Sequence, residues 1–453
     1  MKKKIVAVLM TAAMTASLLA GCGSKESAPA TDAGSTDTAA PAAEAGTDAA
    51  APAAGGENTL SVYAWDANFN IPALKAAEAD YKANVDPDFS LNIIEQSGST
   101  DVETAVTLAG SSGDYSTLPD IVLFQDHWFH KYAVDYPDAF VSVDDAEVDW
   151  SDFGAEKLSY SSLDGVHYGF PVDNGTVIFA YRTDLLEAAG HSIDEMTGIS
   201  WADFIKVGED VYNATGKYLL SMDGDGNDLI YMMLQAEGQS QFKDGKPIVA
   251  ENQTVADIMA VIEEMLAKNV LYLANDWSGY TDQTIVGDMV AGVMNGNWII
   301  PTIKQVPENA GKWEITSLPT LKGGEGFASN GGSSLYITAN CQNPDLAKKF
   351  LAYTFGGSTT TYDAALKDGG VITTCISAGK SDVYNEGVDY FNGQAIYAKI
   401  VEMGSHVPVI EQSDYHYTLR TQMAAAVINI HNGTAPADAL QAAQDQVNFE
   451  MGN

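Results

Sequence analysis

Cysteine and positive charge are both scarce in this sequence. Only three of the 453 residues are cysteine, and 23 Lys and Arg stand against 61 Asp and Glu, for a formal net charge of −38 at pH 7. Nucleic acids and anionic lipid surfaces are bound through clustered Lys and Arg, so this composition argues against both partners; we interpret the charge as a solubility device. Three cysteines also make no disulfide framework. Cys341 and Cys375 leave two alternatives open, one disulfide in an oxidising exterior or two unpaired thiols.

Common catalytic and cofactor patterns are missing as well. The sequence contains no Gly-x-Ser-x-Gly, no phosphate loop and no dinucleotide-binding glycine pattern, so neither an enzyme nor a cofactor is expected. His127 and His130 are spaced i, i+3, but no cysteine or second histidine pair completes a zinc set. We expect both histidines at the surface or at the rim of a cleft.

A calcium loop is only half present. Asp223, Asp225 and Asn227 alternate as such a loop requires, but its sixth position is Asp228 rather than Gly, and its twelfth is Leu234 rather than Glu. Calcium is therefore disfavoured for this segment, which leaves turn chemistry or ligand contact open, and no metal site is predicted.

The N-terminus has the features of an export signal. Lys2–Lys4 precede an apolar run at residues 5–19 that is too short for a good membrane span. The following Leu19-Ala20-Gly21-Cys22 looks like a bacterial lipobox, which predicts a signal peptide at residues 1–21 and a diacylglycerol on Cys22. The alternative is an ordinary signal peptide with a chance cysteine. A lipid contributes about 0.8 kcal/mol per buried CH₂ and would hold the protein at the outer face of the cytoplasmic membrane.

Residues 22–57 read as an acidic tether. They are rich in Ala, Thr, Gly, Pro and Ser and contain no aromatic residue, so they cannot bury enough apolar surface to become ordered. Nearly four hundred residues follow, more than one hydrophobic core usually organises. Two lobes are therefore expected.

The folded part begins with alternating strand and helix patterns. Strand patterns at residues 60–65, 89–95 and 118–124 are separated by helical patterns at 72–82 and 101–109. This order implies a parallel sheet. Ligands of such sheets bind beyond the carboxyl ends of the strands, which nominates the residues that follow the first and third strands. These residues are Trp65, Asp66, Asp126 and Trp128.

The next stretch predicts a passage of the chain between lobes. Asp164-Gly165 suits a hairpin turn, and strands are expected at residues 167–170 and 177–181. Between them, residues 173–175 suit a bend. The arrangement resembles the first hinge crossing of the extracellular solute-binding proteins of ABC importers, the family that includes the maltose-binding proteins. Residues 327–337 and 369–373 resemble the second and third crossings.

The resemblance implies an α/β fold with two discontinuous lobes and a multi-strand hinge, the type II periplasmic-binding-protein fold. Lobe 1 would comprise residues 58–172 and 332–371, and lobe 2 residues 173–331 and 372–453. Residues 288–295 are predicted as a helix. The strand expected after them begins Gly296-Asn297-Trp298, and in the family a strand of this pattern commonly places its Trp in the cleft.

The candidate binding residues fall into two chemical groups. Aromatic faces stack on the C–H groups of sugar rings, although Trp is also common in cores. Carboxylates accept several hydrogen bonds from hydroxyls, although Asp173 is equally suited to a turn. Asn330 and Gly332 could offer amide and backbone donors, or give simple hinge flexibility. The candidates are Trp65, Asp66, Asp126, Trp128, Asp173, Asp223, Trp277, Trp298, Asn330 and Gly332, with Trp277 evenly balanced between cleft and structural roles.

The favoured hypothesis is a lipid-anchored, monomeric substrate-binding protein. It would capture a sugar, preferably an oligosaccharide, between the lobes and deliver it to the transmembrane subunits of an ABC permease. A second hypothesis is a polyamine or another cation as ligand, held by aromatic residues and acids. A surface glycoside hydrolase is disfavoured, because three hinge crossings suit closure around a ligand better than turnover.

Overall fold

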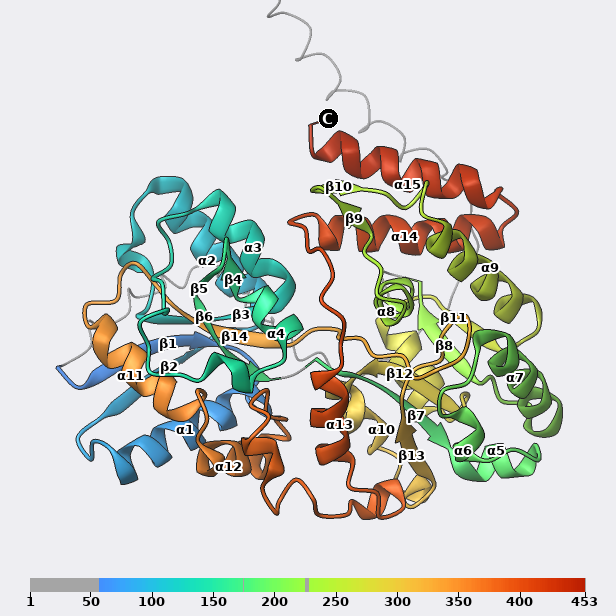
Figure 1. The fold of residues 1–453 in the computed structure, drawn as a ribbon, viewed down its shortest axis with the longest axis horizontal. Helices are drawn as coiled ribbons and strands as arrows, with labels where there is room; N and C mark the ends of the chain where they lie inside the picture. Colours follow the sequence, from blue (N-terminus) through green and yellow to red (C-terminus); the bar gives the residue numbers. More distant parts are fainter. Residues whose placement is uncertain (1–56, 174, 225–227, 453) are drawn as a thin grey trace, which may run out of the picture. The chain divides into compact units, whose positions relative to one another are not determined.

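The computed structural model describes residues 57–173, 175–224 and 228–452. They form two α/β lobes (Figure 1), and lobe 1 is built on a five-stranded sheet of order β2-β1-β3-β14-β6. The strands of this sheet are β1 (Thr59–Ala64), β2 (Ser90–Glu95), β3 (Ile121–Gln125), β6 (Gly169–Asp173) and β14 (Ser333–Ile337).

The first three strands confirm the parallel arrangement expected from the sequence. β1 pairs in parallel with both β2 and β3, and the crossovers are α1 (Asn70–Asn84) and α2 (Ser99–Ser112). The sheet as a whole is mixed, because β14 is antiparallel to β3 and to β6. β14 enters this sheet from the other lobe, far along the chain, so no short-range pattern indicates its direction.

Lobe 2 is centred on β7 (Val177–Arg182). This strand lies between β12 (Gly292–Gly296) and β13 (Trp313–Thr316), both antiparallel to it. β8 (Leu220–Asp223) and β11 (Leu271–Ala274) form a separate parallel pair. A large apolar core joins this lobe's strands to helices that lie apart in the sequence. These helices are α7 (Trp201–Thr215), α8 (Leu229–Ala236), α9 (Gln253–Ala267), α14 (His416–His431) and α15 (Pro436–Glu450).

The chain passes between the two sheets at three places. β6 of lobe 1 is followed by β7 of lobe 2. Ser329, which bridges to Thr176 near the start of β7, precedes β14 of lobe 1 by only four residues. Val371 then packs into the core of lobe 1, whereas its neighbour Ile372 packs into a core that contains β7, β12 and β13. The lobes are thus connected by several adjacent segments.

The remaining short strands are two hairpins, β4 (Ser162–Leu163) with β5 (Val166–His167), and β9 (Phe242–Lys243) with β10 (Lys246–Pro247). Asp164 and Gly165 both have positive φ, 53° and 80°, which confirms the primed hairpin turn predicted there. The remaining α-helices are α3 (Asp126–Asp135), α4 (Ala155–Tyr160), α5 (Thr183–Ala188), α6 (Ile193–Met196), α10 (Ile300–Ile303), α11 (Pro344–Thr354), α12 (Thr359–Gly369) and α13 (Ile396–Ser405). No helix in the described part of the chain combines the length and apolarity of a membrane span.

The helix predicted at residues 288–295 is wrong. This segment contains β12, which is buried along its whole length and pairs with β7. A fully buried strand has no polar face, so its apolar run is hard to distinguish from a buried helix. The helical turns lie earlier, in a π-helix at Gly279–Val286. They end at Gly287, and Asp288 follows with a φ of 57°.

Candidate functional site

A cavity of about 770 Å³ is lined by residues of both lobes. This volume is within the range of roughly 300–1,000 Å³ that is usual for small-molecule sites. Its lining includes the residues after β1, the first turns of α1 and α2, the end of β8, and the segments that cross between the lobes. Nine of the ten candidate residues line it: Trp65, Asp66, Trp128, Asp173, Asp223, Trp277, Trp298, Asn330 and Gly332.

The wall from lobe 1 begins where β1 ends. Trp65 and the exposed Asp66 follow the last residue of that strand. Asp66 has a φ of 67°, and its carboxylate accepts a hydrogen bond of 3.0 Å from the amide of Asn68, which holds the turn into α1. Asn70 and Glu103 also line the cavity, and each carries a buried side-chain oxygen without a hydrogen-bond partner among the described residues. Buried acceptors are rarely left unpaired in proteins, so these two oxygens suit the hydroxyls of a ligand.

Lobe 2 contributes a pair of tryptophans. Trp277 and Trp298 lie with ring centroids 5.8 Å apart and planes inclined by 41°. Trp298 is in a 3₁₀ turn, Asn297–Ile299, and not in the strand expected from the sequence. Its indole nitrogen donates a hydrogen bond of 2.7 Å to the carbonyl of Asn330. Trp298 is therefore fixed against the second crossing segment, while Trp277 is 44% exposed.

Trp128 lies on the first turn of α3 and makes its closest aromatic contact with lobe 2. Its ring is 4.5 Å from that of Tyr417 on α14, at an angle of 30°. The Tyr417 hydroxyl donates to the side-chain oxygen of Gln125 at 3.0 Å. No pattern in the sequence indicated that Tyr417 belongs to the site, because it lies almost 300 residues beyond Trp128.

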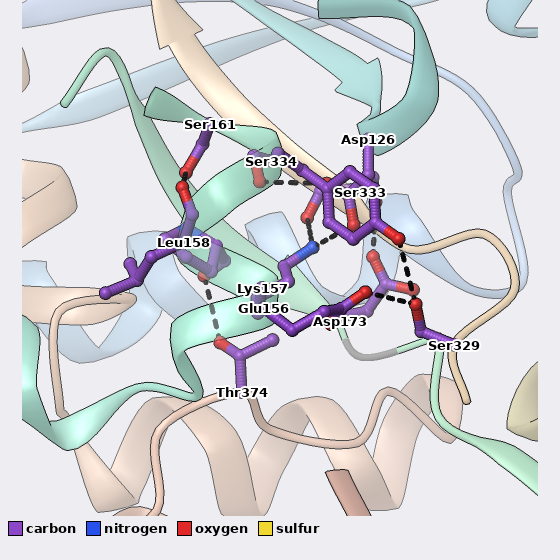
Figure 2. Close-up of polar contacts among 12 residues, drawn as sticks. Asp126, Glu156, Lys157, Leu158, Ser161, Asp173, Ser329, Ser333, Ser334 and Thr374 are labelled. Atoms are coloured by element: carbon purple, nitrogen blue, oxygen red, sulfur yellow. Dashed lines mark hydrogen bonds and ion pairs between the residues drawn. The ribbon is translucent and has the colours of Figure 1, made fainter. Parts of the chain in front are cut away.

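Asp126 is the candidate that the structure does not bring to the cavity. It is 1% exposed, and its carboxylate forms a 2.5 Å ion pair with the buried Lys157 (Figure 2). Lys157 also donates to the carbonyl of Ser333 at 3.0 Å, and Ser334 donates to Asp126 at 3.2 Å. As the first residue of a helix, Asp126 is directed into this cluster and lies behind the cavity wall. Burial raises its pKa to about 7, although Lys157 acts in the opposite direction.

Asp173 connects this cluster with the cavity. It is the last residue of β6, and its carboxylate accepts a hydrogen bond from the Ser333 hydroxyl, at the start of β14 (Figure 2). Burial raises the pKa of Asp173, with Lys157 opposing the shift. Gly332 is required at the same place: its φ is 93°, and a Cβ there would lie 2.5 Å from the Asp126 carboxylate. Lys157 therefore supports a segment of the cavity wall, although Lys157 itself does not line the cavity.

The charge of the lining is mainly negative. Arg420 is the one basic side chain among its described residues, against five carboxylates: Asp66, Glu103, Asp173, Asp223 and Asp228. Arg420 forms an ion pair of 3.1 Å with Asp228. Burial nevertheless raises the pKa of Asp228 to about 6, and burial also raises the pKa of Glu103. Glu103, Arg420 and Tyr417 are lining residues that the sequence did not nominate, whereas Asp228 ends the segment for which ligand contact was one expectation.

Other sequence expectations have separate outcomes. His127 is buried, not exposed, with its ring stacked on His416 at 4.0 Å, so its expected place at the surface or rim is wrong.

The described residues contain no group of three or more His, Cys, Asp or Glu suited to a metal ion. Asp225 and Asn227, like Cys22 and most of the proposed tether, lie outside the described residues. Of the two alternatives for the other cysteines, the structure has free thiols, and Cys375 donates to Asp152 at 3.0 Å.

Comparison with known proteins shows the same architecture and related sequences. Residues 73–392 match the family described as bacterial extracellular solute-binding protein. A lactose-binding protein of Rhizobium radiobacter is 31% identical over 392 residues, which cover 85% of this chain and 92% of that protein. An arabinooligosaccharide-binding protein of Halalkalibacterium halodurans is 21% identical over 381 residues, 81% of this chain and 84% of that protein. The sugar-binding protein MalE of Xanthomonas citri superposes with a TM-score of 0.72 at 18% identity, covering 86% of this chain and 96% of MalE.

Proposed function

Since this chain belongs to the bacterial extracellular solute-binding proteins, we propose that its cavity captures a sugar, preferably an oligosaccharide, for an ABC importer. The observation that carries the proposal is the composition of that cavity. Aromatic rings from both lobes surround it, and acceptor oxygens lie beside them. Flat apolar faces next to hydrogen-bond acceptors are complementary to a pyranose, which has apolar C–H faces and a rim of hydroxyl donors.

Capture is proposed to stabilise the arrangement in which both lobes contact the ligand. Trp65 and Asp66 come from lobe 1, whereas Trp277 and Trp298 come from lobe 2. A ligand that contacts both sets binds the closed arrangement more tightly than an open one, and it shifts the population accordingly. The closed complex is then the form presented to the permease. No chemical change of the sugar is part of this proposal.

The location of this activity is proposed from the sequence. A lipid on Cys22 would keep the protein at the outer face of the cytoplasmic membrane, where residues 22–57 give the folded part its reach. The protein is proposed to act there as a monomer. Mass spectrometry of the membrane fraction tests the anchor: the N-terminal peptide should begin at a diacylglyceryl-modified Cys22, and an unmodified, freely secreted chain would contradict it.

The excess of carboxylates supports a second candidate ligand. Five acids against one arginine also suit a polyamine, held by Coulomb attraction and by cation–π contacts with the tryptophans. Against this candidate, Asp228 is paired with Arg420, and Asp173 lies near Lys157, so part of the negative charge is already compensated.

A thermal-shift screen of the mature chain, residues 22–453, tests the proposal. The compounds are lactose, arabinooligosaccharides, monosaccharides and, as controls, spermidine and amino acids. A ligand that binds only the folded state raises the melting temperature by mass action. A shift with a saccharide and none with spermidine is expected. A shift with spermidine alone would replace the sugar by a cation, and release of shortened sugars during incubation would indicate an enzyme.

A further inference from the structure

Two consecutive residues of α3 pair with two consecutive residues of α14. The rings of His127 and His416 are stacked, with centroids 4.0 Å apart and planes inclined by 5°. Trp128 and Tyr417 follow at 4.5 Å and 30°. Because α3 belongs to lobe 1 and α14 packs in the core of lobe 2, these four residues, here called the aromatic clasp, join the lobes beside the cavity.

The Trp128–Tyr417 half of the clasp belongs to the lining, and its spacing excludes a ligand. A sugar ring between two aromatic faces needs about 7–8 Å, because carbon atoms in contact lie about 3.5–4.0 Å apart on each side. The observed 4.5 Å leaves no such space. The face of Trp128 that meets Tyr417 is therefore closed to sugars, although the residue itself was nominated as a stacking platform.

Tyr417 is held in this position by neighbours on both lobes. Its hydroxyl donates to Gln125 at the end of β3, at 3.0 Å. The guanidinium carbon of Arg420, one helical turn away, lies 5.6 Å from the centre of the Tyr417 ring. With its ring between these groups, Tyr417 acts as a fixed part of the wall. The other aromatic residues of the lining, Trp65, Phe69, Trp277 and Trp298, are then left to stack on a ligand.

We propose that Tyr417 is a specificity-determining residue: by covering Trp128 inside the cavity, it withholds one stacking position and so limits the number of sugar units that the site accepts. This inference rests on the proposed function and specifies its ligand class, namely short oligosaccharides. Removal of the tyrosine ring should add a position lined by Trp128, Gln125, Asp228 and Arg420, all of which already face the same cavity.

Calorimetric titration of the mature chain with two ladders of sugars tests the inference. The ladders are galacto-oligosaccharides extended from lactose and arabinooligosaccharides, each of two to about six units, within the usual span of a small-molecule site. Wild type is compared with Tyr417→Ala and with Tyr417→Phe, which keeps the ring but loses the hydrogen bond to Gln125. Tyr417→Ser serves as a second truncation, and circular dichroism confirms that each variant is folded.

Wild type should bind the short members best. Tyr417→Ala and Tyr417→Ser should move the optimum to a longer sugar and change the long-to-short affinity ratio about tenfold, the size of one aromatic contact. Tyr417→Phe should keep the wild-type ratio, and adding Trp128→Ala to Tyr417→Ala should remove the gain. An unchanged ratio, or an equal loss at every length, would overturn the inference while leaving the proposed function intact. If wild type binds no member of either ladder, the result contradicts both this inference and the proposed function.

Discussion

Lys157 shows how a residue outside the cavity can determine its shape. This lysine is 5% exposed at its side chain and contacts Asp126, Ser333 and, through Coulomb attraction, Asp173. Ser333 and Asp173 both line the cavity and belong to neighbouring strands of lobe 1, β14 and β6, at the ends that meet the second and first crossings between the lobes. A single buried cation thereby holds two crossing segments in register behind the site.

Replacing Lys157 by Met should destabilise the protein strongly. Breaking a buried ion pair costs about 3–5 kcal/mol, because the remaining charge has no partner. Lys157 lowers the pKa of Asp126, which is about 7 in wild type, so the carboxyl of the variant has a higher pKa. The loss in the free energy of unfolding should therefore be larger at pH 8 than at pH 6, because at pH 8 only wild type gains from the ionised pair. Urea denaturation of wild type and Lys157→Met at pH 6 and at pH 8 measures this loss.

The matched control is Lys131→Met, which removes an exposed ion pair with Asp135. Such pairs contribute only about 0.2–1 kcal/mol. Combining Lys157→Met with Asp126→Asn should recover part of the lost stability, since the charge of Asp126 is then removed together with that of its partner. Equal losses for the two lysine variants would show that the buried pair has no special role.

At the residue scale, the expectation that ligands bind beyond the carboxyl ends of parallel strands identified some lining residues of the cavity but not all of them. Trp65, Asp66 and Trp128 follow strands of a parallel sheet, and they line the cavity as that rule implies. Asp126 follows a strand too, but it starts a helix and is directed inward to a lysine 31 residues later. Tyr417 could not be identified from the sequence, because no pattern near it indicates that the start of its helix contacts the other lobe.

At the scale of elements, α3 and α14 each place a buried histidine at the contact between them. Burial lowers the pKa of His127 to about 3 and that of His416 well below its usual range, with Arg420 acting in the same direction on both. Gln412 and Lys157 also act on His127, and Asp228 lies 3.8 Å from His416. As the pH falls below about 6.5, the two histidines become protonated in the unfolded chain but stay neutral in the folded protein. The free energy of unfolding therefore decreases.

Replacing both histidines by Phe should therefore make the protein less sensitive to acid. Between pH 6.5 and 4, each wild-type histidine lowers the free energy of unfolding by up to about 1.4 kcal/mol per pH unit. The raised pKa values of Asp126 and Asp228 oppose this trend in both proteins, so the difference between them isolates the histidines. Urea denaturation at pH 7.5, 5.5 and 4.5 measures that difference.

Phe preserves the stacked geometry of the pair without its titration. The exposed His431 supplies the control: His431→Gln should follow the wild-type pH dependence. If the double Phe variant and wild type lose stability in parallel as the pH falls, the buried imidazoles do not limit acid stability.

Elements with a clear hydrophobic period could be predicted from the sequence, whereas the buried strand β12 could not. The helical patterns at residues 72–82 and 101–109 are found as α1 and α2. β12 was mistaken for a helix, because burial on both sides removes the alternation that identifies a strand. Trp298 was nominated through that segment and still lines the cavity, although its 3₁₀ turn was not foreseen.

At the scale of the whole molecule, chain length predicted two lobes, and the resemblance to the solute-binding family predicted the crossings between them. The pairing of β14 with β3 and β6 joins residues that lie over 150 positions apart, and no local pattern contains that information. Resemblance to a family predicted only that the chain returns to lobe 1 near residues 327–337, not this pairing. The charge of −38 belongs to this scale too, since it is spread over the whole sequence.

That charge gives a prediction about salt. A neutral sugar has no Coulomb attraction to the protein, so its dissociation constant should change little between about 50 and 500 mM salt. A polyamine would lose much of its affinity over the same range, because salt screens its attraction to the acidic lining. Titrations at the two salt concentrations measure the effect, and steep weakening of the best ligand would contradict capture of a neutral sugar.

The most direct test of the account is calorimetric titration of wild type and Trp298→Ala with the saccharide that gives the largest thermal shift. Trp150→Ala is the control, because Trp150 packs on His167 and is absent from the lining. If a sugar stacks on Trp298, Trp298→Ala should weaken binding about tenfold or more, whereas Trp150→Ala should bind as wild type. Wild-type affinity in Trp298→Ala would contradict a sugar held between the lobes against this tryptophan.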